Sequence, residues 1–174
     1  MFRRKPTGRV LEYQSTREIA DAMKRLKCGL RAAVYLYDET SFIISAIAGN
    51  SEYGEPVVLD VDVANDNLGL AVCDALLGHK RDNLPGHSAG KLTDWAAFIA
   101  SGAKTVKAFE NNSWFVYVQT INTAIRMEAG PRISNNRDLV AAATTSTGSM
   151  HVDIGLLLRK ALDGARALRK EGLV

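Results

Sequence analysis

The sequence predicts a single α+β domain in which antiparallel, meander-type sheets pack against helices. One observation behind this prediction is that both halves of the chain show the same order of patterns: a β-hairpin, a further strand and an amphipathic helix. A second is size, because 174 residues with 47% apolar side chains suit about one domain with an ordinary core. We therefore expect residues 1–174 to form one domain with two β-β-β-α repeats, at about residues 30–79 and 103–172, joined by a connector at residues 80–92.

A helix and three strands are expected at the start of the chain. The capping-box pattern from Ser15 to Glu18 predicts where the helix begins, and Gly29 is expected to stop it. Residues 32–37 and 41–48 are rich in β-branched and aromatic side chains, which predicts a hairpin. The alternating stretch 56–63 predicts a third strand with one polar face.

Two further helices are expected in the middle of the chain. Asp66 or Asn67 is predicted to cap the first of them, and Gly78 to close it. Beyond the connector, Thr93 is expected to cap a short helix that ends at Gly102.

The second repeat shows the same patterns as the first. Residues 113–119 and 123–129 predict a second hairpin, and residues 139–147 predict a further strand. Asp153 is expected to cap the last helix, which has apolar residues at helical spacing.

Short segments also recur between the two halves, which supports the repeat. Each half has a Val-Tyr-(Leu/Val) triplet, a strand that ends in Ala-Gly, an (Asn/Asp)-(Leu/Ile)-Gly-Leu segment and an Ala-Leu-x-Gly segment. The paired segments are 34–36 and 116–118, 48–49 and 129–130, 67–70 and 153–156, and 75–78 and 161–164. Two copies are too few for a solenoid, so they suit one pseudo-symmetric domain.

The stretch PGHSAGKLT, residues 85–93, lies in the connector and is similar to a phosphate-binding loop. Such a loop has four residues between its glycines and a Ser or Thr after its lysine. Here Gly86 and Gly90 enclose three residues, and Leu92 stands where the hydroxyl belongs. These glycines therefore indicate a linker and not a phosphate site.

Charge is distributed unevenly along the chain, although the net charge is only +3. Residues 1–31 carry nine Lys or Arg against three acids, whereas residues 32–78 contain no Lys or Arg and eight acids. These acids are Asp38, Glu39, Glu52, Glu55, Asp60, Asp62, Asp66 and Asp74. The block predicts either ordinary solvated loop carboxylates or an electronegative face that meets a basic partner.

No catalytic motif or metal site is predicted, and no cofactor is expected. The three histidines, His79, His87 and His151, show no metal-ligand spacing. A nucleophile at Cys28 or Cys73 paired with one of them remains an alternative, but buried structural thiols are commoner. Asp60 and Asp62 would share one face of the third strand, either as a carboxylate pair or, as we favour, as its solvent face.

A single-stranded nucleic-acid-binding protein is the alternative function. Bases could stack on some of the aromatic residues, with Lys104, Lys107 and the basic N-terminus as phosphate contacts. Most of these aromatics lie at positions expected in a core, and the acidic block works against a continuous positive face. Nucleic acid is therefore not the expected partner.

Two stretches near the middle and end of the chain resemble the CdiI-type immunity proteins of bacterial contact-dependent growth inhibition systems. They are DNLGLAVCDALL, residues 66–77, and VDIGLLLRKALDGA, residues 152–165. The segment SGAKTVKAFENNSWFVYV, residues 101–118, is also similar to a Gly-x-Lys-x-x-x-x-Phe segment of that family. The resemblance covers about residues 30–165, and the high pI of this chain departs from a uniformly acidic inhibitor.

The resemblance implies a non-enzymatic, cytoplasmic protein that binds the C-terminal domain of a cognate toxin and blocks its active site. If that toxin is a nuclease, its cleft is basic, and an acidic surface can occupy it. We therefore expect the toxin to contact residues of the acidic block and one aromatic anchor among them. The candidates are Glu52, Tyr53, Glu55, Asp60, Asp62 and Asp66.

Neither a membrane span nor a secretory leader is expected. No apolar run approaches the ~20 residues that a span needs. The basic N-terminal residues are not followed by the apolar segment of a signal peptide.

Overall fold

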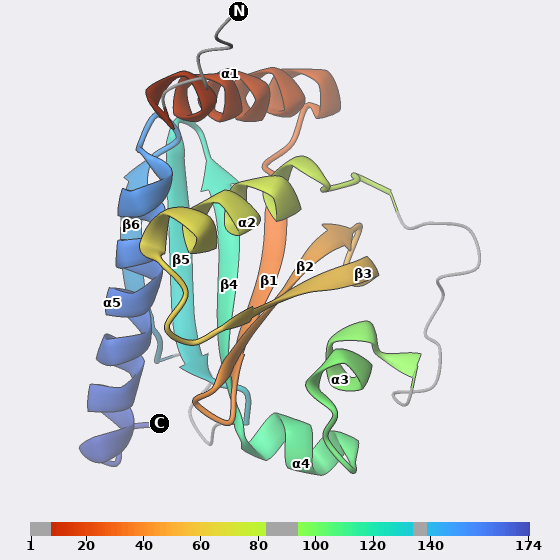
Figure 1. The fold of residues 1–174 in the computed structure, drawn as a ribbon, viewed down its shortest axis with the longest axis vertical. Coiled ribbons are helices and arrows are strands. Elements are labelled where there is room, and N and C mark those ends of the chain that lie inside the picture. The colour runs from red at the N-terminus through yellow and green to blue at the C-terminus, as the bar shows by residue number, and fades with distance from the viewer. Residues whose placement is uncertain (1–7, 83–93, 134–138) are drawn as a thin grey trace, which may run out of the picture.

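The structure is a computed structural model, which describes residues 8–82, 94–133 and 139–174, with side chains from residue 17 onward. Figure 1 shows the arrangement of the elements. The helices are α1 (Gly8–Leu26), α2 (Asn65–Leu77), α3 (Ala96–Ser101), α4 (Val106–Asn111) and α5 (His151–Lys170). The strands are β1 (Arg31–Tyr37), β2 (Ser41–Ala48), β3 (Ser51–Asp60), β4 (Ser113–Ile121), β5 (Ala124–Pro131) and β6 (Ala141–Ser146).

The six strands form one antiparallel sheet in the order β3-β2-β1-β4-β5-β6. The predicted α+β class is confirmed, and so are both predicted hairpins. The two three-stranded meanders are joined into one sheet because β1 pairs with β4 at its centre. Val34 lies opposite Val116, and on either side of this pair Tyr35 faces Phe115 and Ala33 faces Tyr117.

One face of the sheet carries the main core. α2 and α5 lie across this face, and α1 crosses one end of the molecule (Figure 1). Side chains of these helices pack on alternate residues of the central strands, among them Val34, Leu36, Val116 and Val118, all at most 1% exposed. This burial fixes which side of each strand faces the helices.

A smaller, aromatic cluster covers part of the opposite face. Tyr35 and Ile43 of the sheet pack there with Phe109 of α4 and Ala97 of α3, and all four are buried. Half-buried Trp95, Phe98, Phe115, Tyr37 and Tyr117 complete the cluster. The aromatic rings meet in tilted or edge-on pairs, a preferred geometry for such contacts.

α2 and α5 cross at a pair of glycines. A Cβ atom on Gly69 of α2 would lie 1.9 Å from the His151 carbonyl oxygen, and one on Gly155 of α5 would lie 2.1 Å from that of Asn65. The contacts are reciprocal, since Gly69 matches Gly155 in the repeated segments and Asn65 then matches His151. The order of elements agrees with two related units, while their bounds at 30–79 and 103–172 remain a prediction.

Several predicted helix boundaries are wrong. α1 begins at Gly8, well before the Ser15 pattern, and it ends at Leu26, where Lys27 takes a left-handed backbone conformation. α2 begins at Asn65 and α5 at His151, so neither Asp66, Asn67 nor Asp153 is the capping residue. The predicted ends of α2 at Gly78 and of α3 at Gly102 are confirmed.

The third strand and the region after the connector also differ from the prediction. β3 runs over 51–60 and not over 56–63. α4 was not predicted; Thr105 caps it by accepting a hydrogen bond from the Ala108 amide at 3.1 Å. The expected Thr93 cap and residues 83–92 of the connector lie outside the described residues.

Candidate functional site

The six candidate contact residues lie along β3 and the first turn of α2, in two separate groups. Glu52, Tyr53 and Glu55 occupy the beginning of β3, whereas Asp60, Asp62 and Asp66 lie at its end and beyond it. At about 3.3 Å per residue, an extended strand from Glu52 to Asp60 spans on the order of 25 Å. The structure therefore does not gather the six into one patch.

Two residues of the first group are engaged within the protein. Glu52 accepts a hydrogen bond from the Tyr35 hydroxyl, at the margin of the aromatic cluster. Tyr53 donates to the carbonyl of Gly78, and its ring lies 5.1 Å from Lys80 Nζ. Glu55 is exposed in an irregular stretch of β3, where the pairing with β2 shifts register. Of this group, only Glu55 is exposed.

The second group lies at the opposite end of the strand, and all three of its side chains are exposed. Asp60 is the last residue of β3, Asp62 lies in the turn that follows, and Asp66 is in the first turn of α2. The expectation that Asp60 and Asp62 share a strand face is therefore wrong, because the strand ends between them. The β1–β2 turn adds Asp38 to the same end of the sheet, since Ser41 pairs with Asp60. We call Asp38, Asp60, Asp62 and Asp66 the distal acid group.

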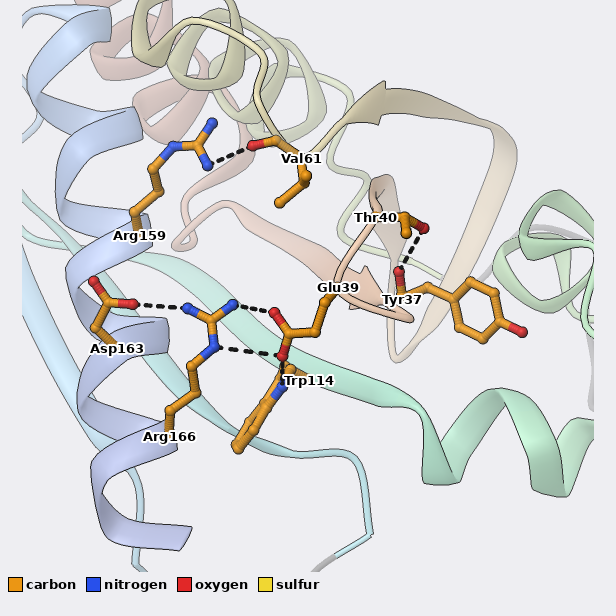
Figure 2. Close-up of polar contacts among 8 residues, drawn as sticks. All are labelled: Tyr37, Glu39, Thr40, Val61, Trp114, Arg159, Asp163 and Arg166. Carbon is orange, nitrogen blue, oxygen red and sulfur yellow. Dashed lines mark hydrogen bonds and ion pairs between the residues drawn. The ribbon is translucent and has the colours of Figure 1, made fainter. Parts of the chain in front are cut away.

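Arg159 of α5 holds the loop that carries this group. Its guanidinium donates to the carbonyl oxygens of Val61 and Val63, at 2.6 and 2.5 Å, and to Asn65 Oδ1 at 2.8 Å. The guanidinium carbon also lies 5.1 Å from the centroid of the Phe42 ring. Figure 2 shows Arg159 reaching from α5 to Val61. One side chain thus fixes the backbone between Asp60 and Asp66.

Replacing Arg159 with methionine is expected to lower the free energy of unfolding by about 2 kcal/mol. Methionine keeps most of the length of the side chain but leaves three acceptors without their donor. Chemical denaturation measures the loss. K160M, at the exposed neighbouring position, is the control and should cost almost nothing. An R159M protein as stable as the control would show that water satisfies the three acceptors of Arg159 without any loss of stability.

A second arginine of α5 fixes the β1–β2 turn, as Figure 2 shows. Arg166 donates to both Glu39 and Asp163, and the Trp114 indole donates to Glu39 Oε1 at 2.7 Å. Partial burial alone would raise the pKa of Glu39. The hydrogen bonds from Arg166 and Trp114 and the charge of Arg166 outweigh it, so the pKa lies below its usual value. Glu39 is therefore tied into the fold, which leaves Asp38 as the free carboxylate of this turn.

The acidic residues offer a surface that a partner could contact. Among the side chains described, those of residues 17–82, 94–133 and 139–174, no three His, Cys, Asp or Glu come together as a metal site would require. No described helix combines the length and apolar character of a membrane span. The distal acid group instead presents exposed carboxylates on a backbone fixed by two arginines, which suits a rigid, electronegative contact surface.

Comparison with known proteins supports the fold. No protein-family model and no curated protein matches the sequence. The structure is similar to a protein of unknown function, NMB0488, from Neisseria meningitidis, with a TM-score of 0.62 and 20% identity over 79% of this chain and 96% of that one. It is also similar to a chain of the CdiA-CT/CdiI toxin and immunity complex from Yersinia pseudotuberculosis, with a TM-score of 0.57 and 18% identity over 78% and 96%.

Sequence reasoning missed Asp38 and both arginines as parts of this region. Asp38 belongs to the acidic block, and an antiparallel β2–β3 pair must bring the β1–β2 turn to the end of β3. The predicted strands could therefore have placed Asp38 near Asp60. Nothing in the sequence indicates that Arg159 or Arg166 would reach the loops of the first half. Their partners lie roughly a hundred residues away along the chain.

Proposed function

We propose that this chain is an immunity protein that binds and neutralises the toxin domain of a bacterial contact-dependent growth inhibition system. The observation that carries the proposal is the similarity of its fold to a chain of the CdiA-CT/CdiI toxin and immunity complex. The resemblance of residues 66–77 and 152–165 to CdiI-type proteins supports the same function independently of the fold. The protein would act in the cytoplasm, without a cofactor, by blocking the active site of its toxin.

The distal acid group is the part of the predicted surface that best fits such a contact. Its carboxylates are exposed, whereas Glu52 and Tyr53 bond within the protein. A nuclease active site is basic because it binds phosphates, so its electrostatic complement is a surface of fixed carboxylates. We therefore propose a nuclease toxin whose basic cleft receives the distal acid group at this end of the sheet, in particular Asp60, Asp62 and Asp66.

The test replaces Asp60, Asp62 and Asp66 together with lysine. The partner is the C-terminal domain of the large secreted protein that this function requires to be encoded immediately upstream, and binding is measured by titration calorimetry at low and high salt. Reversing three charges at a complementary contact is expected to weaken binding by at least about a hundredfold. The loss should shrink at high salt, because salt screens exposed charges.

A control variant carries the same change in net charge elsewhere. Asp21, Asp82 and Glu171 are exposed and lie outside the distal acid group. Their replacement by lysine should leave the affinity nearly unchanged, and both triple variants should keep their helical circular dichroism. Equal losses in both variants would remove the distal acid group as the contact. No binding by the unaltered protein would overturn the immunity function itself.

The nucleic-acid alternative finds less support in the structure. It needs aromatic faces that bases can reach. Phe42 and Phe109 are at most 1% exposed and Trp114 is 8% exposed. The half-buried rings, Trp95, Phe98, Phe115 and Tyr117, pack in the aromatic cluster. Retention of single-stranded RNA or DNA, with a steep dependence on salt, would nevertheless favour it over toxin binding.

A further inference from the structure

A cysteine and a histidine from distant parts of the chain meet at the junction of α1 and α2. The Sγ atom of Cys28, just after α1, lies 3.9 Å from Nε2 of His79, just after α2. His79 is buried, with an exposed fraction of 5%, and the Nδ1 atom of its ring is buried without a hydrogen-bond partner. Cys28 is half-buried and therefore accessible from solvent. The proposed toxin contact uses neither residue.

Both residues are held in place by their neighbours. On one side, the Thr120 hydroxyl accepts a hydrogen bond from the Leu30 amide at 2.8 Å, and a Cβ atom on Gly29 would lie 2.4 Å from the Thr120 carbonyl. On the other, the His79 amide donates to Leu76 and the Lys80 amide donates to Ile47, both at 3.0 Å. The thiol and the imidazole are thus positioned before any reagent arrives.

We propose that Cys28 is a thiol-modification site that takes low-molecular-weight disulfides, with His79 as its general base. His79 Nε2 accepts the proton of the Cys28 thiol, and the thiolate attacks one sulfur of the disulfide. The disulfide bond breaks as the new S–S bond forms, and the leaving thiolate takes the proton from His79. Cys28 ends as a mixed disulfide, the other half of the reagent is reduced to a thiol, and a thiol reductant reverses the step.

The state of the imidazole suits this role. Burial lowers the pKa of His79, and the positive charge of Arg31 lowers it further against an opposing backbone interaction at Ile47. The ring is therefore neutral at neutral pH and can accept a proton. A charged imidazole in the same place could not act as a base.

Cys73 supplies a contrast within the same chain. It is 1% exposed in the main core, and burial, together with the charge of Asp74, raises the pKa of its thiol to about 12. A thiol that is both buried and protonated does not react. We therefore expect the Cys28 thiol to react and the Cys73 thiol to be inert.

The experiment follows adduct formation by intact mass after the folded, full-length protein is mixed with oxidised glutathione. The unaltered protein and C73S should each gain one glutathione, and C28S none. H79Q should react about tenfold more slowly or worse near neutral pH, because the proton acceptor is gone. Its rate should also rise more steeply with pH, following the ionisation of an unassisted thiol.

The second cysteine reports whether H79Q is still folded. If the substitution loosened the core, Cys73 would begin to react as well, and H79N would then replace H79Q as the test variant. A glutathione adduct on C28S in the folded protein would overturn the assignment of Cys28. Equal rates and equal pH profiles in the histidine variants and the unaltered protein would overturn the role of His79.

Discussion

Replacing Gly69 with alanine is expected to lower the free energy of unfolding by about 3 kcal/mol. The new methyl group would lie 1.9 Å from the carbonyl oxygen of His151, and a backbone atom cannot move aside as a side chain can. α2 must then shift away from α5 and open the contact between the helices. The sign of the change in unfolding free energy shows whether the close contact exists. Without it, alanine in place of glycine inside an exposed helix would stabilise the helix by about 1 kcal/mol. Urea denaturation measures the change.

Gly155→Ala is expected to cost a similar amount, since its methyl group meets the Asn65 carbonyl oxygen in the same way. The double variant should cost less than the two single losses added together. One separation of the helices relieves both clashes, and contacts that share a displacement are not additive. G164A is the comparison variant, because its Cβ would meet a single atom, the Ala141 Cβ, at 2.9 Å instead of a backbone carbonyl at about 2 Å. This contact is also tight, so G164A should be destabilising, but by less than either of the other two variants. Single variants as stable as G164A would contradict the close crossing.

Replacing Phe109 with alanine is expected to cost about 4 kcal/mol, in the range for a large aromatic removed from a core. The Phe109 ring is fully buried, with the rings of Trp95 and Tyr35 centred at 4.8 and 5.3 Å. It joins α4 to the sheet and to the residue that precedes α3, so its loss empties the centre of the aromatic cluster. Thermal and chemical denaturation give the magnitude, and near-ultraviolet circular dichroism should lose its aromatic signal.

Phe98→Ala is the matched control for this variant. Phe98 belongs to the same cluster but is half-exposed, and its ring centre lies farther from Phe109, at 6.3 Å. Its loss should cost less than half as much, because less apolar area leaves water on folding. An F109A protein no less stable than F98A would mean that α3 and α4 are not anchored through this ring.

Local patterns in the sequence were sufficient for the two hairpins and the class of the fold. Residues 32–37, 41–48, 113–119 and 123–129 show the composition of buried strands, and the structure forms its hairpins there. The order of elements in the two halves is also visible in the sequence. What local patterns could not show is that the two meanders meet through β1 and β4, since a β-strand pattern does not name its partner.

The misplaced end of β3 has a physical cause. Val61 and Val63 continue the apolar alternation of the strand and pack against the main core, yet they lie beyond the last ladder pair. Their carbonyl oxygens accept hydrogen bonds from Arg159 instead of from a neighbouring strand. Alternation reports burial of every second side chain and does not report what the backbone bonds to. That is also why Asp62 was expected on the strand.

The predicted first residues of the helices were wrong for a related reason. The start of α2 is set at Ala64, without a capping side chain, and Arg159 holds the neighbouring Val63 and Asn65. The candidate site was therefore only partly predictable. The acidic block is visible in the sequence, but the hydrogen bonds that engage Glu52 and Tyr53 within the protein come from distant parts of the chain.

The central position of β1 and β4 has a consequence for the synthesis of this chain. β2 can pair with β1, and β3 with β2, as soon as each strand is made, but the other edge of β1 has no partner until β4 has been made. During that interval, the nascent chain exposes an unpaired strand edge lined with apolar side chains, a template for association with other chains. Because this non-local pairing must close a long loop, we expect slow folding that completes only after β4 is available.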